Sequence, residues 1–150
     1  RSMKSFKDSA GREWNIVINV GQISRLRDRL NIDLAKLYES EARLYKEVVL
    51  DPVAFVNLLF IVCEKQATEQ QVTDVQFGES FDGDTYESAM EAFEEEMLLF
   101  FPKRQRETLT RAKTKGEEIR TKAIEIAKTR LDSLNVTEAA ERMLSGSLTN

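Results

Sequence analysis

The chain has 150 residues, of which 41% are hydrophobic and 32% charged, and its formal net charge is -4. This is enough apolar material for one core, so one compact domain with an arm is the default expectation. The sequence contains no histidine, the usual general base and the commonest metal ligand, which excludes most catalytic and zinc-type sites. We therefore expect no enzymatic activity and no cofactor.

The single cysteine and the hydropathy of the sequence indicate in which cellular compartment the protein is expected. The single Cys63 cannot form an internal disulfide, which suits a reducing compartment. The longest apolar run, residues 53–63, is shorter than the roughly 20 residues that a bilayer span needs. Residues 1–4 lack the apolar segment of a secretory signal. We expect a cytoplasmic protein with no membrane partner.

Charge is distributed unevenly along the chain. Residues 67–101 contain no lysine or arginine, whereas ten acidic residues lie within 69–96. In residues 103–130, ten basic residues oppose four acidic ones. An acidic middle joined to a basic arm indicates a protein that binds macromolecules or itself rather than small substrates.

The N-terminal segment predicts a β-hairpin, with strands over 3–7 and 13–20 and a turn through 8–12. The second strand alternates, so four apolar residues share one face: Trp14, Ile16, Ile18 and Val20. Gly11 permits a positive φ in the turn. Because a two-stranded hairpin is marginal by itself, we expect its apolar face to lie on helices.

Helical periodicity follows the hairpin. Ile23, Leu26 and Leu30 predict a short amphipathic helix, and a second helix should carry Leu34, Leu37, Leu44 and Val48. Asp51 before Pro52 is the N-cap and first residue of a third helix, over 52–66. This helix is apolar on nearly every side, so we expect it at the centre of the core.

Capping-box spacings from Thr68 to Gln71 and from Thr73 to Gln76, followed by Phe77-Gly78, predict a short helical turn that ends at glycine. Asp84, with Glu87 three residues later, should open the next helix, which Pro102 ends. Its apolar stripe contains Tyr86, Met90, Phe93, Met97 and Phe100 or Phe101. Beside the stripe we expect an acidic face made of Glu87, Glu91, Glu94, Glu95 and Glu96. A solvated face is the first interpretation, and electrostatic pairing with the basic arm is the second.

The basic arm shows the rhythm of a packed helix. Its apolar positions are spaced 3, 4, 3, 4, 3, at Leu109, Ala112, Gly116, Ile119, Ala123 and Ile126. Few of these are large, so the arm should be marginal unless it docks on something. A short final helix, capped by Asn135, should follow. We expect an α+β, mostly α fold, with a core domain over 1–102 and a basic helical arm over 103–150.

Metal sites are disfavoured by spacing. The run Asp82-Gly83-Asp84 invites a calcium interpretation, but glycine is not at the sixth loop position and Phe93 stands at the twelfth. A metal site among the carboxylates of the acidic helix would need Glu-x-x-His pairs. We expect neither a metal site nor a catalytic site.

The candidate partner-binding residues lie at the end of the acidic helix and along the arm. A helix can direct only part of an apolar run inward, so some of these side chains should contact a partner. The set comprises Met97, Leu98, Leu99, Phe100, Phe101, Leu109, Ile119 and Ile126. The alternative is that the hairpin and the arm cover both sides of the run.

Several segments together resemble the small tail assembly chaperones of phages and prophage-like elements. They are Gly11-Arg12-Glu13-Trp14, ISRLRDRLNIDL at 23–34, Leu50-Asp51-Pro52-Val53, CEKQA at 63–67, and FGES at 77–80 before the acidic helix that ends in Phe100-Phe101-Pro102. The resemblance covers roughly 3–102 and leaves the arm uncovered. It implies a cytoplasmic assembly factor that transiently binds hydrophobic helical segments of the tape-measure protein while tail-tube subunits polymerise around it.

Two other classes of function stay open from the sequence. One is an oligomeric structural or adaptor protein of a phage-like particle, which self-associates through the arm. The other is a nucleic-acid-binding regulator that uses the basic residues of 103–130. Nucleic acid is the less favoured partner, because this stretch has no aromatic residue for base stacking and the acidic middle would repel the polymer.

Overall fold

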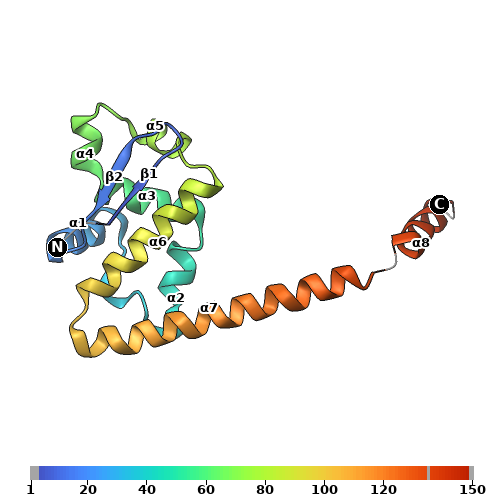
Figure 1. The fold of residues 1–150 in the computed structure, drawn as a ribbon. Helices are drawn as coiled ribbons and strands as arrows, with labels where there is room; N and C mark the ends of the chain where they lie inside the picture. Colours follow the sequence, from blue (N-terminus) through green and yellow to red (C-terminus); the bar gives the residue numbers. More distant parts are fainter. Residues whose placement is uncertain (1–3, 135, 149–150) are drawn as a thin grey trace. The chain divides into compact units, whose positions relative to one another are not determined.

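A computed structural model describes residues 4–134 and 136–148 of the chain (Figure 1). The chain divides into two compact units, Arg1–Leu109 and Thr110–Asn150. The fold is α+β and mostly α, as predicted: an N-terminal antiparallel hairpin packs on helices, and a long helix follows on the C-terminal side.

The hairpin consists of β1 (Lys4–Lys7) and β2 (Glu13–Ile16), with Phe6 paired to Trp14. Trp14, Ile16 and Ile18 are buried as predicted, but Val20 is 72% exposed. The second strand ends four residues earlier than expected because the Asn19 side chain accepts a hydrogen bond from the Gln22 amide at 2.9 Å and starts a helix. The predicted strand residue Met3 lies outside the described residues.

Asp8 organises the turn of the hairpin. The residue is 6% exposed, and its carboxylate accepts hydrogen bonds from the backbone amides of Ala10 (2.9 Å) and Arg12 (3.0 Å). Trp14 Nε1 donates to the same group at 2.9 Å. Burial alone would raise the pKa of Asp8, but the hydrogen bonds from Trp14, Arg12 and Ala10 outweigh it and lower the pKa below its usual value.

Helix α1 (Val20–Leu30) ends at Asn31, which is left-handed with φ 56°. The expected second helix is broken into the 3-10 turn η1 (Leu34–Lys36) and α2 (Glu39–Val48), whose residues Ser40, Glu41 and Ala42 are left-handed. Leu34, in the 3-10 turn, and Leu37, directly after it, are fully buried. Positions three apart share one side in both helix types, so spacing could not separate them.

Helix α3 (Pro52–Val62) is the centre of the core, as predicted. Asp51 caps it by accepting hydrogen bonds from the amides of Val53 and Ala54. The Phe55 ring contacts the Tyr86 and Phe93 rings at centroid distances of 5.7 and 5.3 Å. The predicted span to residue 66 is divided at Cys63, where α4 (Glu64–Glu69) begins.

The Thr73–Gln76 capping box is present and opens α5 (Asp74–Glu79). Thr68 does not cap a helix, because it lies inside α4 and its hydroxyl donates to the Glu64 carbonyl at 3.0 Å. The next helix, α6 (Gly83–Phe100), is capped by Asp82, which accepts a hydrogen bond from the Thr85 amide at 2.9 Å. The predicted cap, Asp84, instead lies in the first turn, where its negative charge interacts favourably with the positive end of the helix dipole.

The acidic face of α6 is not wholly solvated, contrary to expectation. Glu94 and Glu96 are 9% and 1% exposed. Strand β1 lies along α6 (Figure 1), and the Lys4 amide donates to Glu96 Oε1 at 3.3 Å. Tyr45 Oη, from α2, donates to Glu94 Oε1. Both carboxylates are buried because elements distant in sequence bring donors to them.

The C-terminal part contains α7 (Lys103–Asp132) and α8 (Val136–Leu148). Pro102 separates α6 from α7, as predicted, and the unit boundary lies inside α7, after Leu109. The predicted cap of the last helix, Asn135, lies outside the described residues. Within the described ranges, no helix combines the length and the apolar character that crossing a membrane requires.

Candidate partner-binding surfaces

The basic arm carries an exposed apolar stripe. Helix α7 has 30 residues and none of them is buried. The predicted partner-binding residues Ile119 and Ile126 are 62% and 46% exposed. They are seven residues apart with Ala123 between them, so all three lie on one face of the helix. This face, from Ala112 to Ile126, is called the arm seam below.

A second row of exposed apolar residues lies beside the arm seam, and it was not predicted from the sequence. Ile124, Leu131 and Leu134 are 56%, 65% and 59% exposed. With Ala127 they are spaced 3, 4, 3, a signal that was available in the sequence. Helix α8 adds three further exposed apolar residues, Val136, Met143 and Leu144. The second unit therefore presents more apolar surface than the seam alone.

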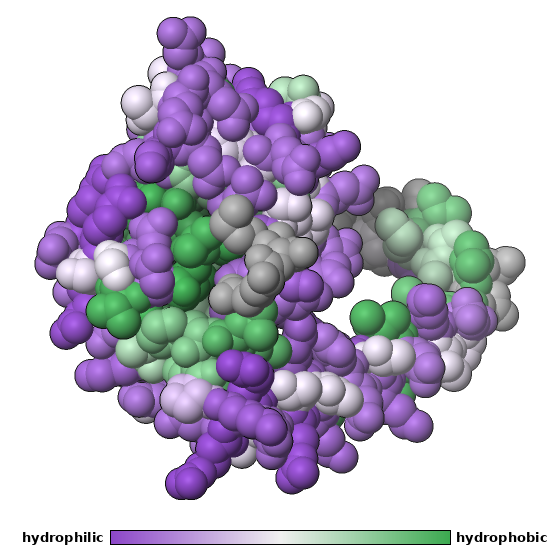
Figure 2. Space-filling view, turned by 60° about the vertical axis from the view of Figure 1, so that its left-hand side comes forward, coloured by the Kyte–Doolittle hydropathy of each residue, from purple (hydrophilic) through white to green (hydrophobic). Residues whose placement is uncertain are grey.

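The run at the end of α6 is divided between the core and the surface. Met97 is fully buried, so its side chain is not available to a partner, which corrects its place in the predicted set. Leu98, Leu99, Phe100 and Phe101 are half-buried. On the face shown in Figure 2, apolar side chains gather into a patch bordered by hydrophilic ones. The run packs the first unit and still leaves apolar surface in solvent.

Arg106 fixes the corner between α6 and α7 within the first unit. Its guanidinium donates to the backbone carbonyls of Leu98 (3.2 Å), Leu99 (3.3 Å) and Phe101 (3.2 Å). These are carbonyls that a helix end leaves without intrahelical partners. The arginine thereby caps α6 and holds the backbone from which the half-buried run projects.

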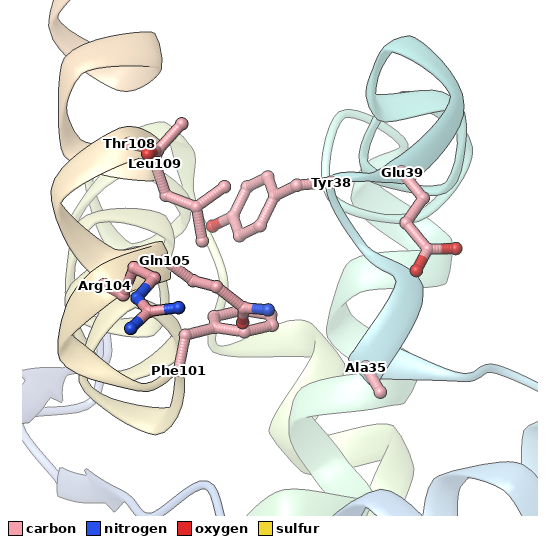
Figure 3. Close-up of a pocket in the computed structure, with 8 residues that line it drawn as sticks. All are labelled: Ala35, Tyr38, Glu39, Phe101, Arg104, Gln105, Thr108 and Leu109. Atoms are coloured by element: carbon pink, nitrogen blue, oxygen red, sulfur yellow. The ribbon is translucent and has the colours of Figure 1, made fainter.

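A shallow pocket of about 350 Å³ lies beside this corner, within the first unit (Figure 3). The Tyr38 ring and the Leu109 side chain point toward one another across it, with Phe101 below them. The Phe101 ring is also 6.0 Å from the Tyr38 ring and 5.5 Å from the Phe100 ring. The full lining is Ala35, Tyr38, Glu39, Phe101, Arg104, Gln105, Thr108 and Leu109.

The pocket brings together two of the predicted partner-binding residues. Phe101 and Leu109 meet there, whereas Ile119 and Ile126 belong to the second unit. Tyr38, which no sequence pattern marked as part of a site, forms the facing wall. Burial and the nearby Glu94 carboxylate both raise the pKa of Tyr38, so its phenol is neutral at physiological pH. The lining thus combines the apolar surfaces of Tyr38, Phe101 and Leu109 with polar side chains, and its charged residues are Glu39 and Arg104.

Cys63 and Asp82, which could in principle act as a nucleophile and a metal ligand, have structural roles in the first unit. Cys63 is fully buried, and burial raises the pKa of its thiol to about 12, so the nucleophilic thiolate is not populated near neutral pH. The Asp82 carboxylate is used as a helix cap. Over residues 4–134 and 136–148, no group of three or more carboxylate or thiol side chains is placed to hold a metal ion.

None of the protein-family models, curated proteins and solved structures with which the chain was compared matches it. The fold and the surfaces are therefore the basis for a functional proposal. They describe a helical protein with a packed first unit and an arm whose apolar residues are exposed.

Proposed function

We propose that this protein is a non-enzymatic tail assembly chaperone that transiently binds hydrophobic helical segments of a tape-measure protein. The observation that carries the proposal is the exposure of Ile119 and Ile126 on a 30-residue helix with no buried residue. A helix with a free apolar stripe is suited to bind the apolar stripe of another helix. The resemblance of residues 3–102 to tail assembly chaperones supports the choice of client.

The first unit supports the proposal with a second contact region. Leu98 and Phe101 keep part of their apolar surface in solvent, and the pocket beside Phe101 has the size to receive one or two apolar side chains. Leucine and aromatic side chains on a helix end are adaptable contacts for amphipathic client helices. Tail-tube protein, which assembles around the tape measure, is a further proposed partner.

The test is co-expression of the full chain with the tape-measure protein of the same phage-like element. We expect the client to become soluble and to co-purify with the chain. The double variant Ile119→Asp/Ile126→Asp should lose most of the complex, because it places two charges in the apolar contact. Both side chains are exposed, so the thermal unfolding of the variant should match the wild type.

The matched control is Thr114→Asp/Thr121→Asp, which adds the same two charges to exposed positions on the opposite side of α7. It should bind the client as the wild type does. Equal binding by both double variants would remove the arm from the site. Failure of the wild-type chain to keep the client soluble would remove the proposed function.

The adaptor alternative predicts something different. An oligomeric adaptor should form a stable oligomer through the arm in the absence of any client. The basic residues Lys115, Arg120 and Lys122, which border the arm seam, argue against that assembly.

A further inference from the structure

We propose that the partner of the arm seam is an acidic amphipathic helix, one whose apolar residues are flanked by aspartate and glutamate. The inference rests on the proposed function in taking the client to be helical. It further specifies that the partner surface is negatively charged. It assigns Lys115, Arg120 and Lys122 as the residues that favour such a partner.

The positions that flank the seam are basic. In heptad terms the seam residues alternate between a and d, and the flanking positions are e and g. Lys115 and Lys122 occupy g, and Arg120 occupies e. The acidic residues of this stretch, Glu117, Glu118 and Glu125, occupy positions b and c, away from the flanks. The apolar stripe is thus bordered on both sides by positive charge alone.

These positive charges are available to a partner. Lys115, Arg120 and Lys122 are exposed, and none of them forms an ion pair with a described residue. Charged residues at e and g set which helix can pair across an apolar seam. A helix with glutamate at the facing positions would pair with all three, whereas a helix with lysine there would be repelled.

Helix α7 of a second copy does not fit the seam. In a parallel pair, Lys115 of one copy would face Arg120 of the other, and in an antiparallel pair lysine would face lysine. The exposed glutamates of α6, Glu87 and Glu91, do not offer an alternative, because α6 has no large apolar residue among the exposed ones. Neither α7 nor α6 of a second copy therefore offers the complementary surface.

Nucleic acid is a poorer match than an acidic helix. Ile119 and Ile126 lie between the basic residues and would stay in contact with water beside a phosphate backbone.

Gly116, at the centre of the seam, also points to a helical partner. A Cβ built there meets nothing within 4 Å, so packing inside the chain does not require glycine. Glycine weakens a helix interior but lets a second helix approach closely.

The first experiment uses the full wild-type chain and two synthetic four-heptad peptides. Both peptides carry the same leucine and isoleucine residues at a and d, and they differ in carrying glutamate or lysine at every e and g position. Fluorescence anisotropy at about 50 mM and about 300 mM salt measures the dissociation constants. We expect the glutamate peptide to bind at least about tenfold tighter at low salt, and the difference to shrink at high salt.

The second experiment reverses the flanking charges. Lys115→Glu/Lys122→Glu should shift the preference to the lysine peptide. The control Thr114→Glu/Thr121→Glu/Lys128→Glu changes the net charge by the same -4, at exposed positions on the opposite face, and should keep the wild-type preference. Circular dichroism checks that both variants keep their helical content.

Equal binding of the two peptides by the wild-type chain would overturn the inference. So would tight binding of a random-sequence DNA duplex with no binding of the glutamate peptide, which would indicate a nucleic-acid surface. If the tape-measure protein co-purifies equally with Lys115→Glu/Lys122→Glu, the proposed function stands and the inference fails. If the glutamate peptide is preferred and the tape-measure protein is not bound, the partner chemistry stands and the proposed client is wrong.

Discussion

The side-chain amide of Gln66 makes two hydrogen bonds with the backbone of Asn15, and so occupies the edge of β2. The Asn15 amide donates to Gln66 Oε1 at 2.8 Å, and Gln66 Nε2 donates to the Asn15 carbonyl at 2.8 Å. The primary amide thus replaces one residue of a neighbouring strand, on the side of β2 that β1 does not cover. Helix α4 closes a two-stranded sheet that would otherwise present a free edge.

Replacing Gln66 with leucine should therefore destabilise the first unit. The substitution leaves the amide and the carbonyl of Asn15 without these partners, and we expect a loss of about 1–3 kcal/mol in the free energy of unfolding. Urea unfolding at neutral pH measures it. Gln70→Leu, an exposed glutamine after the same helix, is the control and should stay within about 0.5 kcal/mol of the wild type. A Gln66→Leu variant as stable as the control would show that the pairing contributes nothing.

The Asp8 carboxylate should make stability depend on pH. Because its pKa is lowered in the folded state, its contribution is present above the unfolded pKa of about 3.9 and is lost as the pH falls toward the lower folded value. We expect Asp8→Asn to cost about 1–3 kcal/mol at pH 7. The difference from the wild type should shrink at about pH 3.

Chemical denaturation at both pH values tests this, with the exposed Asp28→Asn as control. A difference between Asp8→Asn and the wild type that does not change with pH would contradict the prediction. In that case the carboxylate would act through shape and hydrogen-bond number alone.

The left-handed turn at the start of α2 predicts an unusual effect of glycine. Ser40, Glu41 and Ala42 have φ values of 52°, 58° and 59°, a conformation that costs residues with a Cβ roughly 1–2 kcal/mol each. Ala42→Gly should therefore stabilise the protein by about 0.5–1 kcal/mol, even after the greater freedom of glycine in the unfolded chain.

Ala54→Gly, in the regular helix α3, should instead destabilise by roughly 1 kcal/mol. Thermal unfolding of the two variants side by side gives the comparison. Loss of stability in both would mean that residues 40–42 are right-handed in solution.

The flanking charges of the arm predict that the chain does not self-associate through its seam. We expect light scattering to give the monomer mass at micromolar concentration and low salt, because Lys115 would face Arg120 in a parallel homodimer and lysine would face lysine in an antiparallel one. Lys115→Glu/Lys122→Glu should promote association, since glutamate would then face the remaining basic residues. A stable wild-type oligomer that becomes monomeric on deletion of residues 110–150 would favour the adaptor alternative.

Local patterns predicted much of the fold because they depend on near neighbours. Alternation found the hairpin face of Trp14 and Ile16, and spacing with capping residues found α3 and α5. The burial of Glu94 and Glu96 was missed because their hydrogen-bond donors come from α2 and β1, roughly 50 and 90 residues away. Asp82 and Asp84 are both good N-caps, and only the backbone conformation distinguishes them.

The candidate site shows the same division. The spacing of Ile119 and Ile126 predicted the arm seam, because one helix determines which residues share a face. The burial of Met97 could not be predicted in this way, since it depends on how the hairpin and the helices of the first unit pack on α6. Tyr38 was not marked, because its approach to Phe101 is a tertiary contact between segments far apart in sequence.

The only tryptophan of the chain, Trp14, is fully enclosed and meets the edge of the Phe77 ring at 5.0 Å, while α7 and α8 contain no aromatic residue. Indole emission therefore monitors the hairpin and its surroundings and is blind to the arm. Far-ultraviolet ellipticity, by contrast, reports the helices of both units. Heating the protein under both probes would therefore separate a transition of the first unit, seen by both, from a transition of the arm, seen in ellipticity alone, and a client added to the sample would reveal which of the two it protects.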